Sequence, residues 1–163
     1  MKWDSGWILI LVWIFYSSCR DSDEVNYKSV FRYNESSAIS SLDPAFANDL
    51  ESMWVVNQLF DGLVAMDDSL RVVPVLAKNW TISDDGLCYE FILRSDVFFH
   101  DRPGQVPSRK LVASDVVFSF NRIIDPLIAS PGSWIFQNLA VNGVQAINDS
   151  IVQIHLNEPQ GSF

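Results

Sequence analysis

The sequence has few of the residues from which catalytic and metal sites are usually built. Its 163 residues include two histidines and two cysteines. With only His100 and His155 available, neither a protein zinc site nor a catalytic triad can be assembled. We therefore expect no enzyme activity, no metal and no cofactor.

Cysteine cannot cross-link this chain if Cys19 is modified, because Cys88 is then the only thiol left. Cys88 lies in a strand-like run, with no histidine, lysine or arginine beside it to lower the pKa of its thiol. We expect it to be a small buried or half-buried side chain and not a reactive one.

Basic residues are also scarce, since 11 Lys and Arg face 20 Asp and Glu, which gives a net charge of −9. Such an acidic chain is unsuited to nucleic acid and to direct binding of anionic lipid. Internal repeats and low-complexity tracts are absent, whereas hydrophobic residues make up 48% of the chain. That content is sufficient for a globular core.

Long apolar runs are absent apart from residues 7–16 (WILILVWIFY). This run is too short to span a bilayer as a helix, but it suits the apolar core of a secretory signal. Two serines then precede Cys19, which suits a signal peptidase that cleaves after lipid is attached to the thiol. We expect residues 1–18 to be a lipoprotein signal peptide, Cys19 to be lipidated and residues 19–26 to be a flexible tether. The alternative is an ordinary signal peptide in which Cys19 is incidental.

Two segments have the three- and four-residue apolar spacing of amphipathic helices. The first is predicted to begin at an Asn48 cap, with Glu51 three residues later, and to end with Gly62 in the C′ role. The second is predicted to begin at a Ser114 cap and to stop at Asp125-Pro126. The predicted apolar faces are Leu50, Met53, Trp54, Asn57 and Phe60 in the first helix, and Ala113, Val117, Phe120 and Ile124 in the second.

Several shorter segments have the character of strands joined by tight turns. Hairpins are predicted over 63–73 and 144–156, and the turn Asp84-Asp85-Gly86 separates the strands 77–83 and 87–94. Apolar and polar residues alternate most clearly in 87–94. The sum is a mixed α/β (α+β) unit with mostly antiparallel hairpins, without the βαβ rhythm of a nucleotide-binding sheet.

Taken in order, these motifs resemble one family, the family 5 extracellular solute-binding proteins of ABC importers, which includes oligopeptide, dipeptide and nickel receptors. The matching stretches are 42–45 (LDPA), 60–64 (FDGLV), 73–80 (VPVLAKNW), 83–94 (SDDGLCYEFILR), 97–101 (VFFHD), 113–120 (ASDVVFSF) and the closing hairpin through Glu158-Pro159. The resemblance implies a periplasmic-binding-protein-like fold of type II, in which two lobes close on a solute. Residues 27–60 would begin the first lobe, and 61–163 would form most of a small accompanying lobe. The chain thus resembles an N-terminal fragment, truncated at its C-terminus.

The resemblance also implies ligand-binding residues near the first helix. In peptide-binding relatives, the backbone just after the Leu-Asp-Pro motif pairs with the ligand like an added strand. By position, that backbone belongs to Asn48, Asp49 and Leu50 in this chain.

A second ligand contact is implied near the Ser-Pro turn. In peptide-binding relatives an aromatic residue after this turn faces the ligand, whereas this chain has Gly132 at that position. Trp134, two residues later, is the candidate substitute. Trp54 and Trp80 lie on apolar stripes and are expected in the core.

The resemblance therefore implies a receptor that captures a solute, foremost a peptide, and delivers it to ABC permease subunits without covalent chemistry. It would be a monomer in the cell envelope, periplasmic or surface-facing, and held to a membrane by its lipid. Three alternatives stay open. They are a binding protein for a nickel chelate or a saccharide, an exported hydrolase with catalytic residues outside this chain, and a stand-alone surface module.

Overall fold

The computed structural model describes residues 32, 34–100 and 109–160. Residues 36–163 form one compact unit, and residues 1–35 are assigned to another. The predicted signal peptide, Cys19 and the tether lie outside the described residues. In the described part of the chain, no helix is both long and apolar enough to cross a membrane.

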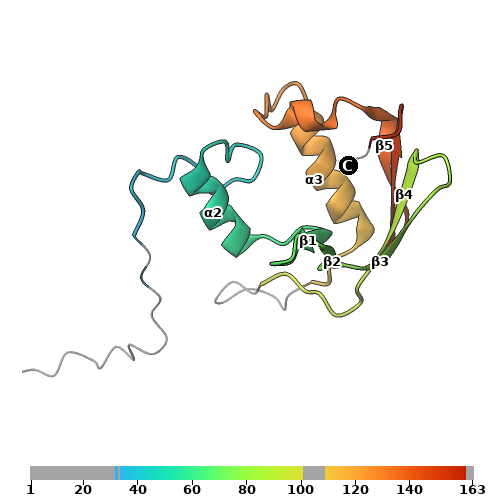
Figure 1. Cartoon of the computed structure of the whole chain (residues 1–163), viewed down its shortest axis with the longest axis horizontal. Coiled ribbons are helices and arrows are strands. Elements are labelled where there is room, and N and C mark those ends of the chain that lie inside the picture. The colour runs from blue at the N-terminus through green and yellow to red at the C-terminus, as the bar shows by residue number, and fades with distance from the viewer. Residues whose placement is uncertain (1–31, 33, 101–108, 161–163) are drawn as a thin grey trace, which may run out of the picture. The chain divides into compact units, whose positions relative to one another are not determined.

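The larger of the two sheets is a four-stranded antiparallel sheet, which lies beside helix α3 (Ala113–Ile124) (Figure 1). Its strands are β3 (Ala77–Ile82), β4 (Cys88–Leu93), β5 (Leu139–Asn148) and β6 (Ile151–Leu156), in the spatial order β3-β4-β6-β5. Because β4 pairs with β6, two hairpins that are distant in sequence share one sheet. The mixed α/β class with antiparallel hairpins is therefore confirmed.

A second, two-stranded sheet precedes this one. Strands β1 (Val64–Met66) and β2 (Val72–Pro74) pair antiparallel, as predicted for 63–73. Asp67 shapes their turn, because its Oδ1 accepts the backbone N–H groups of Ser69 and Arg71, each at 2.9 Å. The proline that ends β2 is compatible with this pairing because it lies at the end of a short strand.

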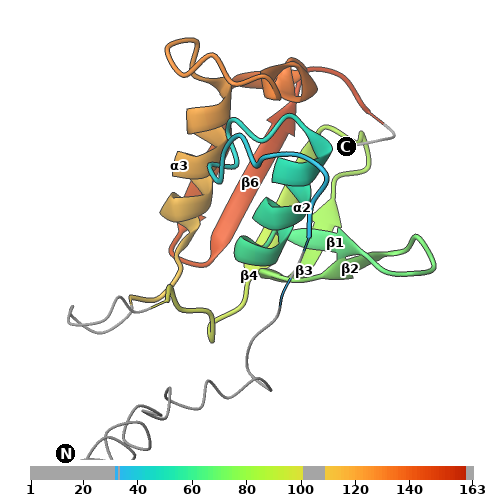
Figure 2. The same cartoon turned by 90° about the vertical axis from the view of Figure 1, so that its left-hand side faces the viewer.

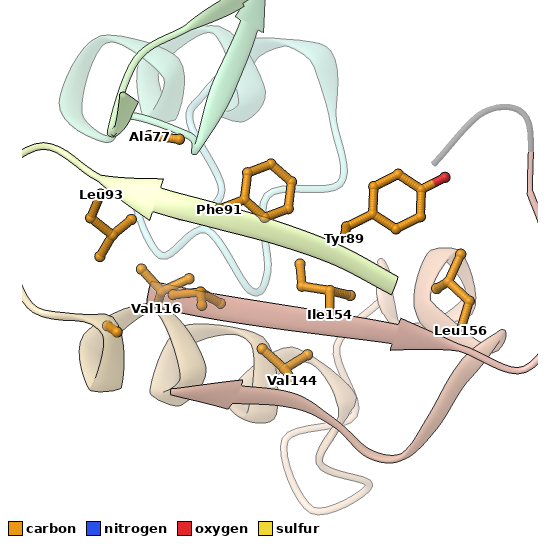
Figure 3. Close-up of a cluster of buried hydrophobic side chains, with 10 residues drawn as sticks. Ala77, Tyr89, Phe91, Leu93, Val116, Val144, Ile154 and Leu156 are labelled. Carbon is orange, nitrogen blue, oxygen red and sulfur yellow. The ribbon is translucent and has the colours of Figure 1, made fainter. Parts of the chain in front are cut away.

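The hydrophobic core lies between the four-stranded sheet and helix α3 (Ala113–Ile124) (Figure 3). Every second residue of β4 and β6 is buried, which confirms the predicted period of two. These side chains are Tyr89, Phe91, Leu93, Val152, Ile154 and Leu156. Trp80 is half-buried and stacks on Phe91 with ring centroids 6.5 Å apart, so it contributes to the core from β3.

The turn between β3 and β4 forms where it is predicted. Gly86 adopts a left-handed conformation with φ 70°, which an L side chain rarely tolerates. Asp85 stabilises the turn through Oδ1, which accepts the Ser83 hydroxyl at 2.5 Å and the Leu87 N–H at 3.0 Å. Aspartate and glycine therefore have structural roles here.

Helix α2 (Leu50–Leu59) begins later than predicted, with Asp49 and not Asn48 as its N-cap. Asp49 Oδ1 accepts the backbone N–H of Ser52 at 2.7 Å. A carboxylate also interacts favourably with the positive end of the helix dipole, which a neutral amide does much less. The predicted glycine cap is wrong too, because the chain leaves α2 in an extended conformation and Gly62 is not left-handed.

Helix α3 has Val112 at its cap position, so the predicted Ser114 cap is wrong. Asp115 takes over the capping role from inside the first turn, where its Oδ2 accepts the N–H of Val112 at 3.0 Å. The helix ends before Asp125-Pro126, as predicted.

Most of the predicted apolar face of α2 is exposed. Trp54 is 55% exposed and Leu50 is 66% exposed, so the predicted core position of Trp54 is wrong. The residues that α2 buries are Ser52 and Val56. The loop before the helix supplies hydrogen-bond partners for Ser52, whereas the stripe that carries Leu50 and Trp54 stays exposed.

Candidate ligand-binding site

A polar network holds the loop before α2 against the start of the helix. Ser52 is fully buried, and its Oγ accepts the backbone N–H groups of Ser40 at 3.1 Å and Ser41 at 3.4 Å. Ser40 also donates its hydroxyl to Asp49 Oδ2 at 2.5 Å. The predicted ligand segment 48–50 therefore lies at a fixed helix start and not in a free loop.

Asp49 already uses both carboxylate oxygens within the fold. The Ser40 hydroxyl foremost, and then the Ser52 N–H, hold the pKa of Asp49 below its usual value. The side chains on either side of it, Asn48 and Leu50, are exposed. Among the described residues, the N–H of Leu50 has no hydrogen-bond partner, as is usual in a first helical turn.

The same loop is attached to the last turn of α3 (Figure 2). Arg122 donates to both carboxylate oxygens of Asp43, at 2.6 and 2.5 Å, and both side chains are partly exposed. Its guanidinium also lies 5.9 Å from the ring centroid of Phe46. The Arg122 hydrogen bonds hold the pKa of Asp43 below its usual value, and Asp43 raises the pKa of Arg122. Asp43, from the Leu-Asp-Pro motif, thus fixes the loop.

The turn that carries the other predicted ligand residues also contacts this loop. Ser130 is 5% exposed and donates its hydroxyl to the backbone oxygen of Ala45 at 2.7 Å. The Ser130 Oγ accepts the N–H of Gly132 at 3.3 Å. One buried hydroxyl therefore joins two segments whose contacting residues are 85 positions apart in sequence.

Trp134 lies beyond this contact, in the 3₁₀-helix η2 (Ser133–Phe136), and is 68% exposed. It lines an open hollow of about 770 Å³ with a mixed polar and apolar lining. The other lining residues are Ile135, Gln137, Asn138, Asn157, Glu158, Pro159 and Gln160. Neither Gly132 nor the segment 48–50 is among them, so the structure links the two predicted segments without arranging all five residues around one pocket.

The structure also contains a cavity that the sequence did not indicate. It has a volume of about 470 Å³ and a mainly apolar lining from the end of α2, residues 60–63, α3 and residues 97–100. The apolar run Val97-Phe98-Phe99 could have pointed to it, because all three residues line the cavity. Asp115 also lines the cavity, but Arg109 donates to both of its carboxylate oxygens at 2.8 and 2.6 Å.

Among the described residues, titratable side chains do not gather into a metal site. Over residues 32, 34–100 and 109–160, no group of three His, Cys, Asp or Glu is arranged to hold a metal ion. Cys88 is half-buried, as predicted. Burial foremost, then the charges of Glu90 and Asp85, raises the pKa of its thiol, which disfavours the reactive thiolate at neutral pH.

Comparison with known proteins identifies relatives of this chain. A sequence model of the bacterial extracellular solute-binding proteins, family 5, middle region, matches residues 71–163. The peptide transport periplasmic protein SapA of Salmonella typhimurium is 36% identical over 146 residues, which cover 83% of this chain and 27% of SapA.

Solved structures agree with the sequence match. The periplasmic binding protein DppA from Helicobacter pylori, in complex with the peptide STSA, superposes with a TM-score of 0.66 at 32% identity. NikZ from Campylobacter jejuni, in complex with Ni(L-His), has a TM-score of 0.66 at 34% identity. These matches cover 76% and 78% of this chain, but only 26% and 24% of the two solved chains. The chain therefore spans about a quarter of the length of these proteins.

Proposed function

The chain belongs to the bacterial extracellular solute-binding proteins of family 5, and on that premise we propose that it is part of a receptor that captures peptides outside the cytoplasmic membrane and delivers them to an ABC permease. The family and the incomplete type II fold expected from the sequence are confirmed. The observation that carries the function is the fold shared with the peptide-bound DppA.

The peptide contacts in this proposal come from the two predicted segments. The exposed backbone at Asn48, Asp49 and Leu50 offers main-chain hydrogen bonds, which accept varied peptide side chains. The exposed Trp134 offers the peptide a large apolar surface, and the small Gly132 lies two residues before it. Binding without covalent chemistry fits a chain whose carboxylates at these segments already hold the fold together.

The arrangement of the complete receptor belongs to the same proposal. Residues 27–60 would begin the first lobe, and 61–163 would form most of the small lobe beside it. Lipidation at Cys19, after removal of residues 1–18, would hold a monomeric receptor at the membrane on the periplasmic or surface side. The name of the periplasmic relative SapA supports this location.

Binding of a defined peptide to the complete purified protein tests the function. The tetrapeptide Ser-Thr-Ser-Ala is the first probe, because it is the ligand in the DppA structure. At a hundredfold excess over its dissociation constant, it should raise the free energy of unfolding by about 2.7 kcal/mol, measured by thermal unfolding. Mass spectrometry should recover the peptide intact, since a hydrolase would consume it.

A pair of variants tests the part played by Trp134. Trp134→Ala should weaken peptide binding by about 1–3 kcal/mol if the indole contacts the ligand. Leu127→Ala is the control, because Leu127 is a 92% exposed apolar residue near the same turn. An equal loss of peptide affinity in both variants would show that Trp134 does not contact the ligand.

A nickel chelate is the second candidate ligand, favoured by the match to NikZ with its bound Ni(L-His). Parallel titrations with nickel–histidine and with Ser-Thr-Ser-Ala separate the two. If only the nickel chelate stabilised the protein, the chelate and not a peptide would be the proposed ligand.

A further inference from the structure

The contacts between the loop before α2 and the end of α3 lie beside the predicted ligand segments. We infer that Arg122 and Ser130 are positioning residues, which fix residues 43–50 and 130–134 relative to each other. In this way they determine ligand affinity without contacting the ligand. The functional part of this inference rests on the proposed peptide receptor.

Arg122 constrains both the distance and the orientation of the loop. A guanidinium that donates two parallel hydrogen bonds to one carboxylate holds its plane as well as its position. The Arg122–Asp43 pair has this two-point geometry. Arg122 extends from α3, whose first turns contribute buried residues to the core, so the loop is fixed to a rigid element.

Asp43 transmits this constraint toward the ligand segment. Its Oδ1 accepts the Ala45 N–H at 3.1 Å, and its backbone oxygen accepts the Phe46 N–H at 3.0 Å. Asp43 therefore shapes the turn that leads into residues 48–50. Without the guanidinium, the turn would retain its local hydrogen bonds but would lose its attachment to α3.

Ser130 provides the second point of attachment. Its buried hydroxyl donates to the Ala45 oxygen and accepts from the Gly132 N–H. Loss of the hydroxyl leaves both of these polar groups without their partner, and buried groups of this kind are normally paired. A change at Ser130 is therefore expected to loosen both segments together.

A purely structural role is the competing explanation. An ion pair that is about one-third exposed on each side usually contributes little to global stability. The pair also lies outside the buried core cluster of the sheet and α3. The main effect of the Arg122–Asp43 pair is thus on local geometry. Experiments can therefore distinguish this effect from an effect on folding.

Hydrogen exchange on the ligand-free complete protein tests the attachment itself. Arg122→Met and Asp43→Asn should each speed amide exchange over 43–52 by about tenfold, and the double variant should add nothing. Arg71→Met is the matched control, because it breaks the comparable pair with Asp67 inside the β1–β2 hairpin. Unchanged exchange in Arg122→Met, or the same change in Arg71→Met, overturns the inference.

Ser130→Ala tests whether the two segments move as one. Exchange should rise over both 43–52 and 130–136, whereas a rise confined to one segment counts against the inference. This measurement needs no ligand. If the unmodified protein binds no Ser-Thr-Ser-Ala, the proposed function fails, and the exchange results alone decide whether the two segments are coupled.

Affinity for Ser-Thr-Ser-Ala separates positioning from stabilisation. Arg122→Met should weaken binding by about tenfold. Arg122→Lys keeps the charge without the two-point geometry, so it should recover little of the affinity while it retains the fold. Leu127→Ala should bind like the unmodified protein. Faster exchange with unchanged affinity would show a merely structural contact.

Discussion

Helices α2 and α3 both have an apolar stripe in the sequence, but different interactions hold them in the structure. In α3, Ala113 is fully buried and Val117 and Phe120 pack against the core, so only Ile124 of the predicted face is exposed. The stripe of α2 remains exposed at Leu50 and Trp54, and the helix buries Ser52 and Val56 instead. Helical spacing therefore predicts a face, but it does not predict which surface will cover that face.

This difference has consequences for how stability is distributed. Full burial of a large apolar side chain contributes about 1.5–3 kcal/mol, whereas a typical hydrogen bond contributes about 0.5–1.5 kcal/mol net. The sheet and α3 are stabilised mainly by many buried apolar side chains, whereas the start of α2 depends more on hydrogen bonds. We therefore expect α2 and its loop to open more readily than the sheet.

The largest expected effect comes from a core truncation in β6. Ile154 is 1% exposed, so Ile154→Ala should lower the free energy of unfolding by about 2–5 kcal/mol. Leu50→Ala on the exposed stripe of α2 should stay within about 0.5 kcal/mol of the unmodified chain. Urea unfolding measures both. A loss of stability in Leu50→Ala comparable to that in Ile154→Ala would mean that another surface covers the α2 stripe in solution. The contrast between α2 and α3 would then be wrong.

A smaller effect is expected from a buried serine in α2. Ser52→Ala removes the acceptor of the Ser40 and Ser41 N–H groups and should cost about 1–3 kcal/mol. Ser119 in α3 is the matched control, because its exposed hydroxyl donates only to the Asp115 backbone oxygen at 3.0 Å. Ser119→Ala should change the stability by less than about 0.5 kcal/mol. Similar losses in urea unfolding would show that hydrogen bonds are no more important to α2 than to α3.

The strands were predictable because their information is local. Alternation in 87–94 defines the buried face of β4, and the Asp84-Asp85-Gly86 turn needs only neighbouring residues. The helix caps depended on less local information. Asn48 and Asp49 are both suitable caps, and the Ser40 hydroxyl that engages Asp49 comes from nine residues away.

The candidate site was less predictable than the fold. Its two segments came from a family resemblance, and the contact that joins Ala45 to Ser130 leaves no periodic or spacing signal in the sequence. The cavity bordered by α2, α3 and residues 97–100 is equally non-local. Periodicity defines elements and their faces, whereas the tertiary arrangement decides which polar side chains meet.

Lowering the pH should unfold α2 and its loop before the sheet. The expected loss of stability is smaller than in either pair of substitutions above. Arg122 and the Ser40 hydroxyl lower the pKa values of Asp43 and Asp49 in the folded protein. Their ionised forms therefore stabilise the fold above the unfolded-state pKa of about 3.9, and this stabilisation is lost as the pH falls through the folded values. Since β6 contains no carboxylate, amide NMR signals of α2 should collapse at a higher pH than those of β6. Asp49→Asn keeps a good N-cap without a titrating group and should narrow this gap. Simultaneous collapse would instead show that α2 and the sheet unfold as one cooperative unit, in spite of their different contacts.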